Sequence, residues 1–176
     1  MSMTRRVVED VETLKALSHP IRLRLLGMLR SDGPATATEL ARTLEESSGS
    51  TSYHLRQLER YGFVADAVEQ PSGRERRWRA VHDMTTLPDS LAELPGAREA
   101  LDQVHDRQLR VLADGVETWR ATGSGEGYGH SDYLLELDPD DLRELTEEIS
   151  ALVERYRTKA GSNPVSLHVL ALPRSS

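Results

Sequence analysis

The stretch Ser50-Thr-Ser-Tyr-His-Leu-Arg-Gln-Leu-Glu-Arg-Tyr-Gly-Phe-Val64 decides the fold of this chain. Thr51, Leu55 and Leu58 recur at helical spacing, which predicts one buried stripe on a helix capped by Ser48. Tyr61-Gly62 predicts its end, because glycine tolerates the backbone conformation that closes a helix. After Gly62 the pattern becomes strand-like. The stretch therefore predicts a short helix that leads directly into a strand.

A second short helix is predicted just upstream. Thr36 and Glu39 have the spacing of a capping box, in which each side chain bonds the other residue's backbone N–H. The segment 45–49 supplies a tight turn between the two helices, which is the helix-turn-helix arrangement. Two earlier helices are expected at residues 7–17 and from Pro20 to Arg30, interrupted at Ser18-His19-Pro20.

A basic hairpin is predicted downstream of the helix-turn-helix. Residues 63–68 and 77–81 are candidate strands, and Gln70-Pro-Ser-Gly73 has turn chemistry between them. A hairpin in this place is a wing. Four positive charges lie at its tip and on its return strand, from Arg74, Arg76, Arg77 and Arg79.

The helix from Ser50 to Arg60 resembles the recognition helix of ArsR-type winged-helix regulators, which reads approximately Ser-x-His-Leu-x-x-Leu-x-x-x-Gly-Leu-Val. Phe63 replaces the usual leucine. Leu14-Lys-Ala-Leu-Ser-His-Pro-Ile-Arg22 resembles the opening motif of the family, and the hairpin ending at Trp78 lies where the family has its wing. The resemblance covers residues 10–82 and implies DNA binding by a homodimer joined through a long helix.

A recognition helix lies in the major groove and needs a face of hydrogen-bonding groups with few acids. We expect Ser50, Tyr53, His54 and Gln57 to form that face, with phosphate contacts from flanking and wing arginines. The full set of candidate DNA-binding residues is Ser50, Ser52, Tyr53, His54, Arg56, Gln57, Arg60, Arg74, Arg76, Arg77 and Arg79.

Each assignment has a plainer alternative. His54 is otherwise a solvent-exposed helix residue, and Tyr53 otherwise covers the base of the wing. The wing arginines are otherwise a solvated hairpin edge, which discourages strand aggregation. We interpret His19 and Arg22 as structural, with His19 capping a helix, and Trp78 as packing in the wing.

The second half has a different character. A long helix is predicted over residues 96–121, and a glycine-rich connector at 123–129 ends it. A strand is expected at 133–137, then a helix that starts at Asp138-Pro139 and buries its apolar stripe, then a strand at 165–172. The predicted fold is mainly α with small β. It consists of a winged helix-turn-helix, residues 1–86, followed by a dimerisation helix and a strand–helix–strand α+β segment, residues 87–176.

Charge is unevenly distributed along the chain. The net charge of −7 divides into +2 for residues 1–82, with 13 basic against 11 acidic residues, and −9 for the remainder. Screening limits electrostatic reach to about 10 Å, so a local basic face decides phosphate attraction. We expect a cytoplasmic protein, because the chain has no cysteine and no apolar run long enough for a bilayer, and Glu9-Asp10 come too early for the apolar region of a signal peptide.

Metal binding and catalysis have little support in the sequence. Without cysteine, a thiolate metal site is excluded. Asp102, His105 and Asp106 share one helical turn, but an acidic solvated face explains them better, and we predict no metal and no cofactor. The glycine run lacks the Gly-Lys-Ser/Thr ending of a phosphate loop, so we predict no enzyme.

These features predict a sequence-specific transcriptional regulator, a repressor by family analogy, that binds a palindromic operator in double-stranded DNA as a homodimer. The acidic segment either adds dimer surface or holds a small-molecule effector. The alternatives are a winged-helix protein-interaction module without DNA binding and an Asp/His metal sensor.

Overall fold

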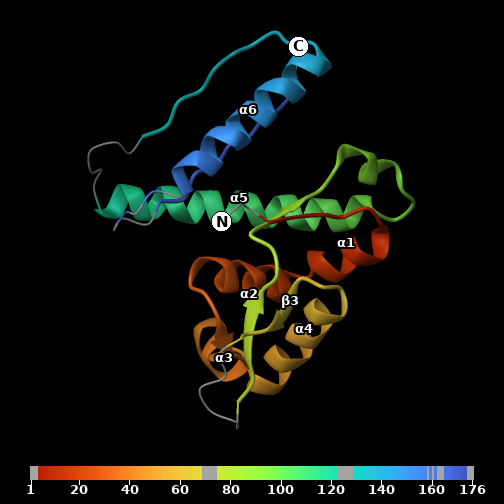
Figure 1. Ribbon diagram of the computed structural model, residues 1–176, viewed down its shortest axis with the longest axis vertical. Coiled ribbons are helices and arrows are strands. Elements are labelled where there is room, and N and C mark those ends of the chain that lie inside the picture. Colours follow the sequence, from red (N-terminus) through yellow and green to blue (C-terminus); the bar gives the residue numbers. More distant parts are fainter. Residues whose placement is uncertain are drawn as a thin grey trace. The chain divides into compact units, whose positions relative to one another are not determined.

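A computed structural model of the chain describes residues 4–68, 75–122, 129–157, 159, 161 and 165–173. The chain divides into two compact units, Met3–Leu109 and Arg110–Ser176 with Met1–Ser2. Figure 1 shows the elements in sequence colours. In chain order they are β1 (Arg5–Val7), α1 (Val11–Ser18), α2 (Pro20–Ser31), β2 (Ala35–Thr36), α3 (Ala37–Leu44), α4 (Ser48–Arg60), β3 (Val64–Asp66), β4 (Arg77–Ala80), β5 (Met84–Thr86), the 3-10 helix η1 (Asp89–Glu93), α5 (Arg98–Thr122) and α6 (Pro139–Arg157).

The first two helices are set by their caps. Asp10 accepts the backbone N–H of Thr13 at 2.7 Å, so α1 starts after Asp10. The predicted start at Val7 is wrong, because Val7 belongs to β1. The imidazole of His19 caps α2, and its Nδ1 accepts the N–H of Ile21 at 3.2 Å, which confirms the predicted capping role. Pro20 follows in the first turn, as predicted.

The helix-turn-helix is formed by α3 and α4. The capping box is confirmed: Thr36 Oγ1 accepts the N–H of Glu39 at 3.2 Å, and Glu39 accepts the N–H of Thr36 at 2.7 Å. The helix α3 ends at Leu44, and the φ of 57° at its C-cap, Glu45, is left-handed. Ser47 rather than Ser48 caps α4. Gly62, at φ 71°, turns the chain out of α4 and into β3.

The wing is a three-stranded antiparallel sheet in the order β2-β4-β3. Val64 pairs with Ala80, and Ala35 pairs with Trp78. Both predicted hairpin strands are present but shorter than expected, and the predicted turn at 70–73 lies outside the described residues. A strand that was not predicted, β1, pairs in parallel with β5, matching Arg5 to Met84. This pairing ties the N-terminal segment to the chain that leaves the wing.

The hydrophobic core lies inside the unit Met3–Leu109. Helices α1 to α4 contribute leucines to it, the wing contributes Trp78, and the start of α5 contributes Leu101 and Val104. Leu14, Leu25, Leu55 and Leu58 have no exposed surface. The core therefore holds α4 in place from inside and leaves its other face outward.

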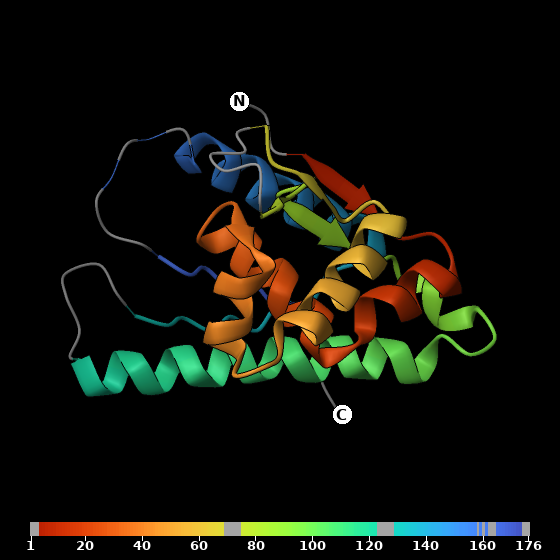
Figure 2. The same cartoon turned by 90° about the horizontal axis from the view of Figure 1, so that it is seen from below.

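The predicted long helix is confirmed as α5, which Figure 2 shows as one uninterrupted helix. Asp138-Pro139 starts α6 as predicted, and the N–H of Leu142 bonds the carbonyl of Asp138 at 3.0 Å. The strands predicted at 133–137 and 165–172 are absent, since the chain is irregular there. The prediction that α6 buries its apolar stripe is also wrong, because Leu142, Leu152 and Tyr156 are exposed.

The fold class is nonetheless as predicted: mainly helical, with small sheets, a winged helix-turn-helix and a long helix. The first compact unit continues to Leu109, beyond the domain boundary expected at residue 86. Among the described residues, no helix has the length and apolar content needed to cross a membrane.

Candidate nucleic-acid interface

Helix α4 has one inward and one outward face. Thr51, His54, Leu55 and Leu58 are buried. The outward face carries Tyr53, which is 56% exposed, with Arg56, Gln57 and Arg60 at the i+3, i+4 and i+7 positions. Ser50 and Ser52 are half-buried and lie near the start of α4. The structure thus places six of the seven α4 candidates at the surface.

His54 is the exception. Its side chain is 7% exposed, so the predicted place on the exposed face is wrong. The ring lies 4.5 Å from the ring of His19, measured between centroids, and Tyr53 meets it edge-on at 5.3 Å. His54 Nδ1 is buried and has no hydrogen-bond partner in the described part of the chain. His54 therefore joins α4 to the start of α2.

The surroundings of the two imidazoles favour the neutral form of each ring. Burial lowers the pKa of His54 below its ordinary value, and the nearby His19 and Arg22 lower it further. Burial also lowers the pKa of His19, and Arg22 adds to this effect. Glu46 opposes the shift at both rings, but its effect is smaller than that of burial.

The free energy of unfolding should therefore decrease in mild acid. The unfolded histidines titrate near pH 6.5, above their folded counterparts, so below that pH the unfolded chain binds more protons. The free energy of unfolding, measured by urea denaturation, should have its full value above about pH 6.5. It should decrease as the pH is lowered to 5. His54→Gln should flatten this dependence whatever it does at pH 7.5. An unchanged difference between pH 7.5 and pH 5 in the variant would contradict the prediction.

The wing arginines are largely engaged within the protein. Arg76 forms ion pairs with Glu59 and Asp66, and its guanidinium lies 3.8 Å from the centroid of the Trp78 ring. Hydrogen bonding from Arg76 also lowers the pKa of Asp66. Glu59 and Asp66 thus offset the charge of Arg76, and DNA contact by Arg76 stays a prediction.

The remaining wing arginines differ from one another. Arg77 donates to the carbonyl of Pro34 and lies 3.7 Å from Glu39, so it secures the wing to the start of α3. Arg79 is half-buried, and its Nη1 lies 3.3 Å from the carbonyl of Ala80. Arg74 lies outside the described residues. DNA contact by the wing stays a prediction.

The exposed arginines of α4 differ from the wing arginines in their ion pairing. Arg56 and Arg60 are both exposed, and neither has an ion-pair partner among the residues the structure describes. The first turn of α4 contains no acidic residue. The outward face of α4 therefore offers two unengaged guanidinium groups beside the phenol of Tyr53 and the amide of Gln57, which is the chemistry that phosphates and base edges require.

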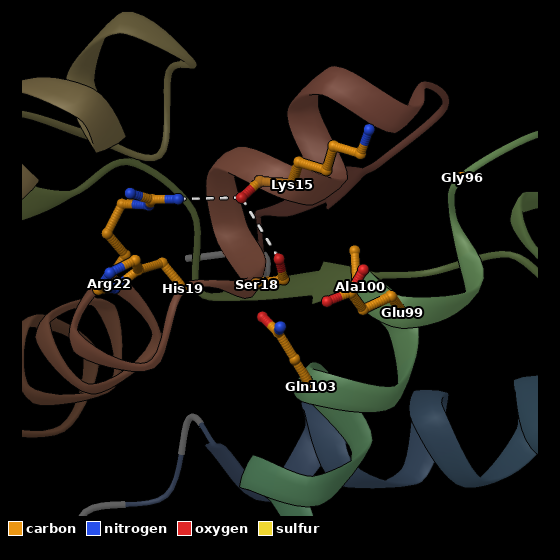
Figure 3. A pocket seen from close by; sticks show the side chains of 8 residues that line it. All are labelled: Lys15, Ser18, His19, Arg22, Gly96, Glu99, Ala100 and Gln103. Carbon is orange, nitrogen blue, oxygen red and sulfur yellow. Dashed lines mark hydrogen bonds between the residues drawn. The ribbon is translucent and has the colours of Figure 1, made fainter.

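A pocket that sequence reasoning missed lies near the same histidine pair. It has a volume of about 260 Å³ and is lined by Lys15, Ser18, His19, Arg22, Gly96, Glu99, Ala100 and Gln103. Figure 3 shows His19 and Arg22 on one side of it and the α5 residues Glu99 and Ala100 on the other. Arg22 also donates to the Lys15 carbonyl at 2.9 Å, at the end of α1. His19 therefore touches both the pocket and the buried ring of α4.

The geometry of the described residues does not support the Asp/His metal-sensor alternative. Asp102, His105 and Asp106 are exposed on α5. In the part of the chain that the structure describes, no three His, Asp or Glu side chains are grouped as metal ligands.

Known proteins share this domain. Residues 17–66 match the family model of a helix-turn-helix domain. HlyU from Vibrio cholerae N16961 is 31% identical over 38% of this chain and 68% of its own, with a TM-score of 0.34. An ArsR family transcriptional regulator is 26% identical over 64% of this chain and 98% of its own, with a TM-score of 0.36. None of the curated proteins compared matches the chain.

The fold and the α4 face define a winged helix-turn-helix protein of the transcriptional-regulator class. Residues 17–66 form a helix-turn-helix domain, and the motifs of the chain resemble those of the ArsR-type regulators. The resemblance lies in the motifs quoted above and in the match of residues 17–66 to the helix-turn-helix family model. It concerns the first half of the chain.

Proposed function

We propose that the protein is a sequence-specific DNA-binding regulator that inserts α4 into the major groove. The observation that carries this proposal is the outward face of α4. Tyr53, Arg56, Gln57 and Arg60 lie there together while the opposite face is fixed in the core. In this proposal Gln57 reads a base edge, and the two arginines contact phosphates. A regulator of this kind acts in the cytoplasm. Its proposed role requires no catalysis.

The proposed active form is a homodimer joined through α5. Leu112, Val116 and Trp119 are half-buried on one stripe of this helix, and Leu109, in register with them, is 55% exposed. A stripe of this kind requires a partner surface. A two-fold dimer presents two α4 helices to an operator of matching symmetry, and a bound dimer represses by blocking access to a promoter.

The pocket beside His19 supports the small-molecule part of the proposal. A ligand there would contact His19, which stacks on His54 of α4. Two packed rings therefore separate the pocket from the recognition helix. A ligand that displaced His19 would change how α4 is seated, and with it the affinity for DNA.

The spacing of the two half-sites tests this proposal. A duplex selected from genomic fragments should bind two protomers, with half-sites about 10 bp apart from centre to centre. Inserting 5 bp between the half-sites moves one to the opposite side of the duplex, so affinity should decrease to that of random DNA. Binding of one protomer per duplex, or binding that is indifferent to the insertion, would overturn the dimer-on-palindrome proposal. The matched control carries a 5-bp substitution at the same place without a change in length.

The protein-interaction alternative also has an observation in its favour. Arg76 and Arg77 are engaged internally, which reduces the attraction of the wing for phosphate. Absence of binding to both selected and random duplexes at 50 mM salt would favour this alternative over DNA binding.

A further inference from the structure

Helix α6 carries an apolar stripe with a regular spacing. Leu142, Leu145, Ile149, Leu152 and Tyr156 are separated by three, four, three and four residues. This is the a and d pattern of a coiled-coil heptad. None of these side chains is buried: Leu142 is 41% exposed, Leu152 44% and Tyr156 60%. The stripe is therefore the surface of a helix that has the pattern for a helical partner.

The charges of α6 divide along its length. Its first half has a net negative charge, with Asp140, Asp141, Glu144, Glu147 and Glu148 against Arg143, and its end has a net positive charge, with Arg155 and Arg157 against Glu154. Two copies aligned in parallel would bring five acids of one helix beside the same five of the other. Two copies aligned antiparallel would bring the acidic half of each beside the basic end of the other. The helix is therefore complementary to itself in one orientation only.

We propose that α6 packs antiparallel against α6 of a second copy of this chain. The two-fold axis then passes between Ser150 and Ala151. Ile149 packs on the partner subunit's Leu152, and Leu145 packs on the partner subunit's Tyr156. Each contact occurs twice by symmetry.

The positions that flank this seam select the orientation. With a at Leu142, Glu148 and Arg155 both take position g of the heptad. In the antiparallel pair, Glu148 faces the partner's Arg155, and Arg155 faces the partner's Glu148. In a parallel pair, Glu148 would instead face the partner's Val153. Charge pairs at these flanking positions set the partner and the orientation of coiled coils.

A second copy is the occupant because the complementarity is contained within one sequence. Two heptads are too short to form a stable dimer alone. The pairing therefore adds to the α5 interface, and to that extent the inference rests on the proposed homodimer. It also gives the acidic second half of the chain a role that does not involve DNA.

Charge reversal tests the pairing. Glu148→Arg alone, or Arg155→Glu alone, sets like charges against each other twice, so each variant should dimerise about tenfold more weakly in sedimentation equilibrium. An equimolar mixture of the two variants should recover the parental affinity, because the heterodimer restores both opposite-charge pairs. Glu147→Arg, with the same charge change on an outward position, is the matched control.

Amide hydrogen exchange over residues 142–156 gives a local readout, even if the α5 contact alone holds the dimer together. Exchange should be slow in the parent, fast in either single variant and slow again in the mixture. Parental behaviour in both single variants would overturn the pairing. Loss without recovery in the mixture would show that α6 packs within its own chain, and would overturn it as well. Neither measurement uses DNA, so failure here is distinct from failure of DNA binding.

Discussion

Leu58→Ala is expected to lower the free energy of unfolding of the winged unit by about 2–5 kcal/mol, the range found for leucines cut back to alanine in a close-packed core. Leu58 has no exposed surface and belongs to the cluster that holds α4 inside the unit. Because whole domains are stable by only about 5–15 kcal/mol, the variant should lose a large part of its stability and with it the position of α4.

Urea denaturation followed by tryptophan fluorescence measures this effect. Trp78 is 3% exposed in the wing and reports on the unit, and a Trp119→Phe background removes the signal from α5. Ser52→Ala, at a half-buried position on the same helix, is the control and should change the stability by less than about 0.5 kcal/mol. Equal stability in Leu58→Ala and Ser52→Ala would show that the inward face of α4 is assigned wrongly.

The double variant Arg56→Ala, Arg60→Ala is expected to weaken DNA binding about 100-fold at low salt. Both guanidinium groups lie on the outward face of α4, and neither is engaged in an ion pair within the described residues. Each phosphate contact that is lost removes about one released counterion, so the slope of log affinity against log salt should become less steep by about two. Fluorescence anisotropy with a labelled duplex measures both quantities.

A control variant with the same charge change outside α4 separates the effect of the α4 contacts from the effect of overall charge. Arg5→Ala with Arg24→Ala removes two exposed arginines from the same compact unit, outside α4. This control should lose only a few-fold in affinity, through weaker long-range attraction. If the two double variants lost affinity equally, α4 would have no special place in the contact with DNA.

Local signals predicted the starts of α2, α3 and α6. The capping box of Thr36 and Glu39 and the Asp138-Pro139 start depend on neighbouring residues alone, so the sequence is sufficient to place them. The strands β1 and β5 are three residues each, too short to show a period. They pair across 79 positions, so no pattern in the neighbouring sequence predicts them.

In the candidate site, too, the sequence predicted the features that depend on neighbouring residues and missed those that depend on distant ones. Thr51, Leu55 and Leu58 predicted the inward stripe of α4, but a helix covered on more than one side buries more than one stripe. His54 is buried because His19, 35 positions earlier, lies against it. Counting the arginines predicted a basic wing, while Glu59 and Asp66, which engage Arg76, are brought to it only by the fold. The segments expected as strands beside α6 had suitable composition, but no strand within the described residues pairs with them.

The central claim is that α4 reads DNA sequence. The most direct measurement compares dissociation constants for a selected duplex and a random duplex of equal length between 50 and 200 mM salt. We predict that the selected duplex binds at least about 1,000-fold more tightly near physiological salt, and that binding of both duplexes weakens as a power of the salt concentration. Equal affinity for the two duplexes, or no binding to either at 50 mM salt, would contradict it.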